Sequence, residues 1–308
     1  MFSVIFPGQG SQVVGMGKEF YDKFDLVKKL FKEADDTLNF SISKLILEGP
    51  KEELDLTVNT QPAIFLISYS IYNVIKKEFN IDLSNAKYFA GHSLGEYSAL
   101  VAANSISVDV ALKLVRKRGE LMELAPKGSM SAIMGLEDII ISDICLAASI
   151  DENSHVQCAN LNSPNQTVIS GHDDAVNRAQ DLCLSKGAKR AIKLKVSIAS
   201  HSKLMLRAAD EFQKALEAVE FCMPDTKIIH NVSVDTASSS NEIQSLLVSQ
   251  LHSPVRWVEI CGFISTLNLP IIECGPGKVL SGLFKANKLE CYFSTSDEDF
   301  YEKINNYG

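Results

Sequence analysis

The pentapeptide GHSLG at 91–95 constrains this 308-residue chain more than any other feature. The apolar run 88–90 before it predicts the end of a buried strand, and 96–103 after it has the small and apolar periodicity of a packed helix. Glycines two residues before and after a serine allow strand and helix to cross closely at a strained turn. The pattern therefore predicts a nucleophile elbow that holds the Ser93 hydroxyl at a helix N-terminus.

A bare GxSxG pattern also occurs in ordinary tight turns, so a serine nucleophile needs a partner base elsewhere in the chain. Of the six histidines, His201 is the first candidate for this base, because it follows the strand-like segment 191–196 after a short loop and lies after the serine in the chain. His92 belongs to the turn itself and is expected to be structural. Asp235 follows His201, which reverses the usual order of acid and histidine, so a carbonyl oxygen is the alternative group to orient the imidazole.

A second glycine-containing loop follows the strand pattern Ser3 to Phe6. Its two glycines, within 7–12, permit backbone N–H groups to converge, and Gln9 is placed to present one of them. The alternative interpretation is an ordinary strand-to-helix turn.

Composition excludes several classes of protein. The chain is 46% apolar and carries a formal net charge of −8, which argues against a general nucleic-acid binder because phosphate neutralisation needs a basic surface. The N-terminal segment lacks the positively charged region of a signal peptide, and no run of about 18 apolar residues appears in the sequence. We therefore expect no signal peptide, no membrane segment and a cytoplasmic location. Seven scattered cysteines without CxxC spacing indicate neither a metal site nor a disulfide framework.

The order of the patterns predicts an α/β-hydrolase-like core with a parallel sheet. Further strands are expected at 227–231 and 270–274, and the turn 275–280 leads into a closing helix. Helical patterns cover Glu19 to Leu38, Ser41 to Leu47, Asn59 to Ile75 and Val108 to Met122.

The pattern of strands and helices changes between Met130 and Val196. There the predicted order of elements is βαββαβ, with a turn at 162–165 and a last strand at 191–196. This order is typical of a ferredoxin-like unit inserted into the larger fold. We therefore expect a large catalytic domain formed by 1–127 and 198–308, and a small subdomain formed by 128–197.

Several separate segments together resemble the malonyl-CoA:acyl carrier protein transacylases of bacterial type II fatty acid synthesis. The resemblance covers nearly the whole chain, and several patterns in the right order are far more specific than one. The segments are 6–12, 59–62, 91–96, 118–119, 160–164, 200–202, Gln250 with 254–257, and 275–280.

The resemblance implies roles for the residues around the serine. Ser93 would accept the acyl group, His201 would be the general base, and the backbone amides of Gln9 and Leu94 would form the oxyanion hole. Gln250 resembles the residue whose main-chain carbonyl holds the histidine.

The same resemblance assigns substrate contacts. Arg118 would bind the free carboxylate of the malonyl group. Its planar guanidinium, with two parallel donors, is better suited to a carboxylate than the ammonium of lysine is. Asn160 and Asn162 would lie near the CoA arm. The segment 197–200 before His201 departs from the commoner proline-containing form, which bears on fine acyl specificity.

The implied reaction moves a malonyl group from malonyl-CoA to the phosphopantetheine thiol of acyl carrier protein by a ping-pong route, without a metal or redox cofactor. The alternatives are a serine esterase or thioesterase, an acyltransferase of polyketide synthesis with another acyl specificity, and a carrier-binding scaffold without turnover. The basic segment 186–195 concentrates five positive side chains in an acidic chain, so it is expected to steer an acidic carrier protein unless it is merely a solvated surface.

Overall fold

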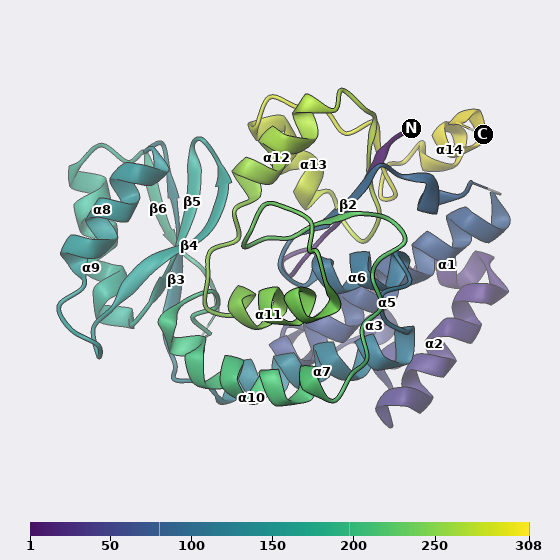
Figure 1. Ribbon diagram of the computed structural model, residues 1–308, viewed down its shortest axis with the longest axis horizontal. Helices are drawn as coiled ribbons and strands as arrows, with labels where there is room; N and C mark the ends of the chain where they lie inside the picture. The colour runs from purple at the N-terminus through teal and green to yellow at the C-terminus, as the bar shows by residue number, and fades with distance from the viewer. Residues whose placement is uncertain (80, 197, 308) are drawn as a thin grey trace.

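A five-stranded parallel sheet forms the centre of the larger part of the protein (Figure 1). The structure, a computed structural model, describes residues 1–79, 81–196 and 198–307. The strand order is β7-β2-β1-β8-β9, and every neighbouring pair is parallel. The strands are β1 (Ser3–Phe6), β2 (Tyr88–Gly91), β7 (Ile228–Ile229), β8 (Ile271–Glu273) and β9 (Phe293–Ser294).

Apolar side chains alternate between the two faces of this sheet, so each face needs its own cover of helices. Val4 and Phe6 belong to one core cluster, whereas Ile5 belongs to a second cluster on the opposite face. The helices of the first cluster are α1 (Lys18–Lys23), α2 (Asp25–Leu38), α3 (Ile42–Glu48), α4 (Lys51–Leu54), α5 (Thr57–Glu78), α6 (Gly95–Ala102), α7 (Val108–Leu124), α10 (Leu206–Glu217), α11 (Ser240–Gln250) and α14 (Phe300–Tyr307). Those of the second are α12 (Trp257–Thr266) and α13 (Val279–Ala286).

A four-stranded antiparallel sheet lies beside this body, at the left of Figure 1. Its chain order is β3, α8, β4, β5, α9, β6, and its spatial order is β4-β5-β3-β6. Helices α8 and α9 pack side by side on one face of it, over Ile133 and Ile169. The elements are β3 (Ser129–Met134), α8 (Asp138–Ala148), β4 (Val156–Ser163), β5 (Gln166–Gly171), α9 (Asp173–Ser185) and β6 (Arg190–Lys193).

The structure corrects several element boundaries. The helical pattern over Glu19 to Leu38 forms two helices, because Phe24 between them has an extended backbone (φ −120°, ψ 119°). The strand expected at 191–196 ends at Lys193, and the one expected at 227–231 is two residues long. The turn expected at 162–165 is shorter, since β4 continues to Ser163. Ser197, at the expected subdomain boundary, lies outside the described residues.

Candidate active site

The chain turns sharply between β2 and α6, and Ser93 lies in that turn with a left-handed backbone (φ 50°). The two flanking glycines allow a very close crossing. A Cβ on Gly91 would lie 1.9 Å from the carbonyl carbon of Gly95, and a Cβ on Gly95 would lie 2.1 Å from the Phe6 oxygen. Only residues without a side chain fit, and the turn presents the Ser93 side chain to a cavity of about 410 Å³.

His201 reaches the serine from the loop between β6 and α10. Its Nε2 atom lies 2.9 Å from Ser93 Oγ, and its Nδ1 lies 2.7 Å from the main-chain oxygen of Gln250, the last residue of α11. Because a carbonyl only accepts, this contact places the hydrogen on Nδ1 and leaves Nε2 free to accept a proton from Ser93. Asp235 is exposed and is not part of this arrangement.

Burial sets the charge state of His201. Its side chain is enclosed, and desolvation, followed by the positive charge of Arg118, lowers the pKa of His201 to about 3. The imidazole is therefore neutral at physiological pH, as a general base must be before the reaction.

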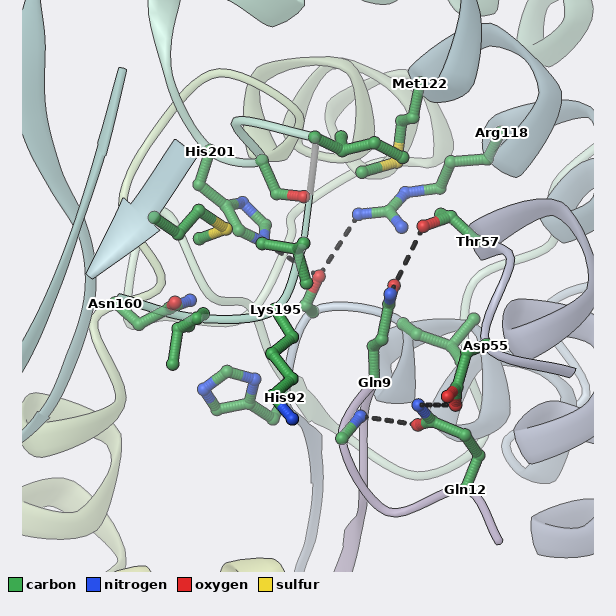
Figure 2. A pocket seen from close by; sticks show the side chains of 18 of the residues that line it. Gln9, Gln12, Asp55, Thr57, His92, Arg118, Met122, Asn160, Lys195 and His201 are labelled. Carbon is green, nitrogen blue, oxygen red and sulfur yellow. Dashed lines mark hydrogen bonds between the residues drawn. The ribbon is translucent and has the colours of Figure 1, made fainter. Parts of the chain in front are cut away.

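Arg118 extends from α7 into the same cavity and is only 1% exposed (Figure 2). Its Nη2 lies 3.2 Å from Ser93 Oγ and 2.9 Å from Gln250 Oε1, and its Nη1 lies 2.9 Å from Gln61 Oε1. Its Nε has no hydrogen-bond partner among the described residues. Burial lowers the pKa of Arg118 from its usual value. No carboxylate is within salt-bridge distance of it in the described part of the chain.

Gln9 and Leu94 both line the cavity beside Ser93. Their backbone N–H groups are not among the donors of any hydrogen bond in the described part of the chain. Leu94 directly precedes α6, and the Gln9 side chain donates to Thr57 Oγ1 at 3.2 Å (Figure 2). Two unpaired backbone donors next to a nucleophile can stabilise a developing oxyanion.

The two asparagines expected near the substrate occupy different places. Asn160 lines the cavity. Asn162 does not; its Oδ1 lies 3.0 Å from His92 Nε2, and His92 in turn packs on Trp257 with ring centroids 5.3 Å apart. The Asn162 side chain therefore contacts His92, and its expected place near the CoA arm stays a prediction. Gln250 does not line the cavity either; its main-chain oxygen contacts His201, and its side-chain oxygen accepts from Arg118.

Two residues around the serine were not expected from the sequence. Asn231 accepts the Ser93 N–H at 2.7 Å and donates to Gly91 O at 2.7 Å, so it clamps both sides of the turn. Glu96 is buried next to it and accepts the Asn231 N–H at 3.1 Å. The only available signal was the position of Glu96 directly after the GxSxG pattern.

Neither a metal centre nor a membrane span is found in the ranges that the structure covers. No group of three or more histidine, cysteine, aspartate or glutamate side chains there is arranged to hold a metal ion. None of the helices described is both long and apolar enough to cross a membrane.

The fold and this serine–histidine site are those of an acyltransferase, and a family model described as "Acyl transferase domain" matches residues 3–276. A malonyl CoA-acyl carrier protein transacylase of Bacillus subtilis is 46% identical over 285 residues, which are 91% of this chain and 88% of the relative. The relative of the same name from Escherichia coli K12 is 41% identical over 288 residues, 92% of each chain. This chain belongs to the malonyl CoA-acyl carrier protein transacylase family.

Solved structures agree with the sequence comparison. An acyl carrier protein S-malonyltransferase from Vibrio cholerae O1 superposes with a TM-score of 0.93 at 42% identity, covering 98% of this chain and 99% of that one. A malonyl-transacylase in complex with a type II PKS acyl-carrier protein gives a TM-score of 0.94 at 39% identity, covering 100% and 99%. The α/β fold with its parallel sheet is therefore the fold of this family.

Proposed function

We propose that this protein transfers the malonyl group of malonyl-CoA to the phosphopantetheine thiol of acyl carrier protein through a malonyl ester of Ser93. The observation that carries the proposal is the meeting of three groups at one atom. Ser93 Oγ lies 2.9 Å from the neutral base His201 and 3.2 Å from the buried cation Arg118. A nucleophile, a base and a cation suited to a free carboxylate are together what malonyl transfer requires.

The first half-reaction forms the ester. His201 Nε2 accepts the Ser93 proton while Oγ attacks the thioester carbonyl, and the N–H groups of Gln9 and Leu94 receive the negative oxygen. As the carbon–sulfur bond breaks, His201 returns the proton to the departing CoA sulfur. The main-chain oxygen of Gln250, 2.7 Å from Nδ1, stabilises the imidazolium formed in between.

The second half-reaction reverses these steps with the carrier. His201 accepts the proton of the phosphopantetheine thiol, the sulfur attacks the ester carbonyl, and the proton passes to Ser93 Oγ as the carbon–oxygen bond breaks. The charge and atoms are restored at the end of each cycle. No residue changes its redox state.

Arg118 binds the malonyl carboxylate in this proposal. Removing a carboxylate from water is strongly unfavourable unless a matched donor receives it. Arg118 Nη2, which lies 3.2 Å from Ser93 Oγ, is such a donor on the side of the nucleophile. This feature favours a transferase of dicarboxylic acyl groups over a general esterase or thioesterase.

The finer architecture supports the same proposal. We take the turn at Ser93 as a nucleophile elbow, supported by the strand–turn–helix order and the close crossing at Gly91. We take 128–197 as a ferredoxin-like subdomain, supported by its βαββαβ order and the strand order β4-β5-β3-β6, and 1–127 with 198–308 as the catalytic domain. Asn160, on β4, would then bring a contact for the CoA arm from the subdomain.

The carrier protein is proposed to dock beside the basic segment 186–195. All five of its cationic side chains are exposed, and of these only Lys193 forms an ion pair with a described residue. After β6 ends at Lys193, the chain continues into Leu194 and Lys195, which line the active-site cavity. A carrier bound there would have its phosphopantetheine arm at the cavity mouth. The cytoplasmic location expected from the sequence stays a prediction.

Mass measurement of the intact protein tests the proposed function. Incubation with malonyl-CoA should add one malonyl group to the wild type and none to Ser93→Ala. His201→Ala should acylate slower by a factor on the order of 10³ or more, because an unactivated serine is a poor nucleophile. The matched control, His172→Ala, should behave as the wild type. Near-normal acylation of His201→Ala would contradict the assignment of the base.

The fate of the malonyl group separates the proposal from its alternative. With radiolabelled malonyl-CoA and holo-acyl carrier protein, we expect the label on the carrier. Label released mainly as free malonate would instead support a thioesterase.

A further inference from the structure

Glu96 is a carboxylate buried directly behind the nucleophile, and the steps above do not use it. Its side chain is 2% exposed. Oε1 accepts hydrogen bonds from His230 Nδ1 at 2.8 Å and from Asn231 N at 3.1 Å, and Oε2 accepts one from Gln250 Nε2. Three donors thus converge on this side chain, which is how a protein retains a buried carboxylate.

The side-chain amide of Gln250 connects Glu96 with Arg118. An ionised carboxylate can only accept, so it holds the NH₂ group of the amide toward itself. The amide oxygen must then point the other way, where it accepts from Arg118 Nη2 at 2.9 Å. The same NH₂ group also donates to the main-chain oxygen of Ser93 at 3.1 Å. With the amide reversed, an NH₂ group would face the guanidinium, and Arg118 would lose an acceptor.

We propose that Glu96 is a positioning residue that acts through Gln250 to hold Arg118 where it binds the acyl carboxylate. This inference deepens the proposed function and rests on it. Glu96 touches neither substrate nor the reacting atoms. Its effect is on which acyl groups the site accepts and not on proton transfer.

The isosteric change Glu96→Gln breaks this relay in a defined way. An amide at position 96 has one accepting oxygen and one NH₂ group, so one set of its former donors loses its acceptor. Asn231 donates through its backbone and cannot turn, whereas the Gln250 amide can turn over about its terminal bond. We therefore expect Gln250 to reverse and to present its NH₂ group to Arg118.

A double-mutant cycle tests the relay. Rates of Ser93 acylation by malonyl-CoA and by acetyl-CoA are measured for the wild type, Glu96→Gln, Arg118→Ala and the double variant. Glu96→Gln should lower the malonyl-to-acetyl rate ratio by about tenfold or more, with acetyl transfer changed by less than about threefold. In the double variant the ratio should equal that of Arg118→Ala alone, because Glu96 acts through Arg118.

Other outcomes overturn the inference. An equal fall for both substrates in Glu96→Gln would mean that Glu96 supports only the fold or the turn at Ser93. Independent, multiplying effects in the double variant would mean that it does not act through Arg118.

A second variant covers the case in which Glu96→Gln does not fold by circular dichroism. Gln250→Met removes the amide but keeps the main-chain oxygen that holds His201, and it should lower the same ratio; an unchanged ratio would overturn the relay. Absence of malonylation in the wild type would overturn the proposed function itself, whereas normal wild-type malonylation with an unchanged ratio in the variant would overturn only the role of Glu96.

Discussion

Arg118 is the buried side chain that, in the proposed function, sets substrate choice. A malonyl group would bring into the cavity a carboxylate that has left water, and Arg118, a buried cation that lines the cavity, would receive it. Arg118→Ala should lower kcat/KM for malonyl-CoA by about 30- to 4000-fold, which corresponds to roughly 2–5 kcal/mol for an unpaired buried charge. The acetyl group has no carboxylate that could be left unpaired, so kcat/KM for acetyl-CoA should fall little. Equal losses for the two substrates would show that Arg118 supports the fold or the CoA moiety.

The same arginine also affects the base. Burial and, after it, the charge of Arg118 disfavour the charged imidazolium, so the pKa of His201 lies at about 3. The base is neutral above this value and is lost as the pH falls through it. Acylation by acetyl-CoA should therefore keep its rate down to about pH 5 in the wild type. In Arg118→Ala the fall in rate at low pH should begin at a higher pH, since the second-largest cause of the lowered pKa of His201 is gone. Using one acyl-CoA for both proteins cancels the titration of CoA itself.

The residues of the site differ in how far the sequence could reveal them. Ser93 and His201 could be named from the GxSxG pattern and the order of residues along the chain, whereas Arg118 was named only through the resemblance to a family. The contacts of Asn231 and Glu96 could not be predicted, since their amide and carboxylate groups meet only after α6, α11 and the segment that follows β7 are packed together. Spacing along the chain does not encode such contacts.

At the scale of elements, the crossing of β1 and α6 places the nucleophile, and glycine makes it possible. Gly95 is the first residue of α6, where alanine would normally be favourable. The added Cβ would lie 2.1 Å from the Phe6 carbonyl oxygen, a backbone atom that cannot move aside cheaply. We expect Gly95→Ala to lower the free energy of unfolding by about 2 kcal/mol or more and to reduce acylation of Ser93.

A matched glycine provides the control for this prediction. Gly262 lies inside α12, and a Cβ there would meet nothing within 4 Å. Gly262→Ala should raise the free energy of unfolding by about 0.5–1 kcal/mol, because alanine is the better helix former. Urea unfolding of the two variants checks the difference in sign. A Gly95→Ala protein as stable as the wild type would contradict the close crossing.

Element prediction succeeded where burial gives a strong pattern. The strand Ser3–Phe6 agrees with its expected bounds, because a fully buried strand is a continuous apolar run. The break at Phe24 lies in a segment without glycine or proline, so the sequence does not indicate it; the Phe24 ring packs against Phe20 and Phe79. The strand β9 has only two residues and depends on pairing with β8, so a local pattern could not reveal it.

At the scale of the whole molecule, the site lies where the two sheets meet. Gln157 on β4 donates to the main-chain oxygens of His201 and His252 at 3.1 Å each, and the Leu161 N–H donates to Val255 O at 2.9 Å. These contacts fix the position of the smaller sheet relative to the catalytic loop. The basic segment 186–195 on that sheet is thereby held at the rim of the cavity, where Lys195 lines it.

Charge reversal on this segment tests how the acidic carrier is guided. Lys189 and Arg190 are exposed, and neither forms an ion pair with a described residue, so their charges are free to attract an acidic partner. Lys189→Glu with Arg190→Glu should raise the apparent KM for acyl carrier protein and weaken its dependence on salt, while acylation by malonyl-CoA alone changes little. The control is Lys87→Glu with Lys227→Glu. It reverses two exposed charges at the amino ends of β2 and β7, whereas Ser93 follows the carboxyl end of β2. The control makes the same change in net charge, so an equal rise in KM for both pairs would reveal a general charge effect. If the salt dependence of KM is unchanged in Lys189→Glu with Arg190→Glu, the segment 186–195 is not the docking surface.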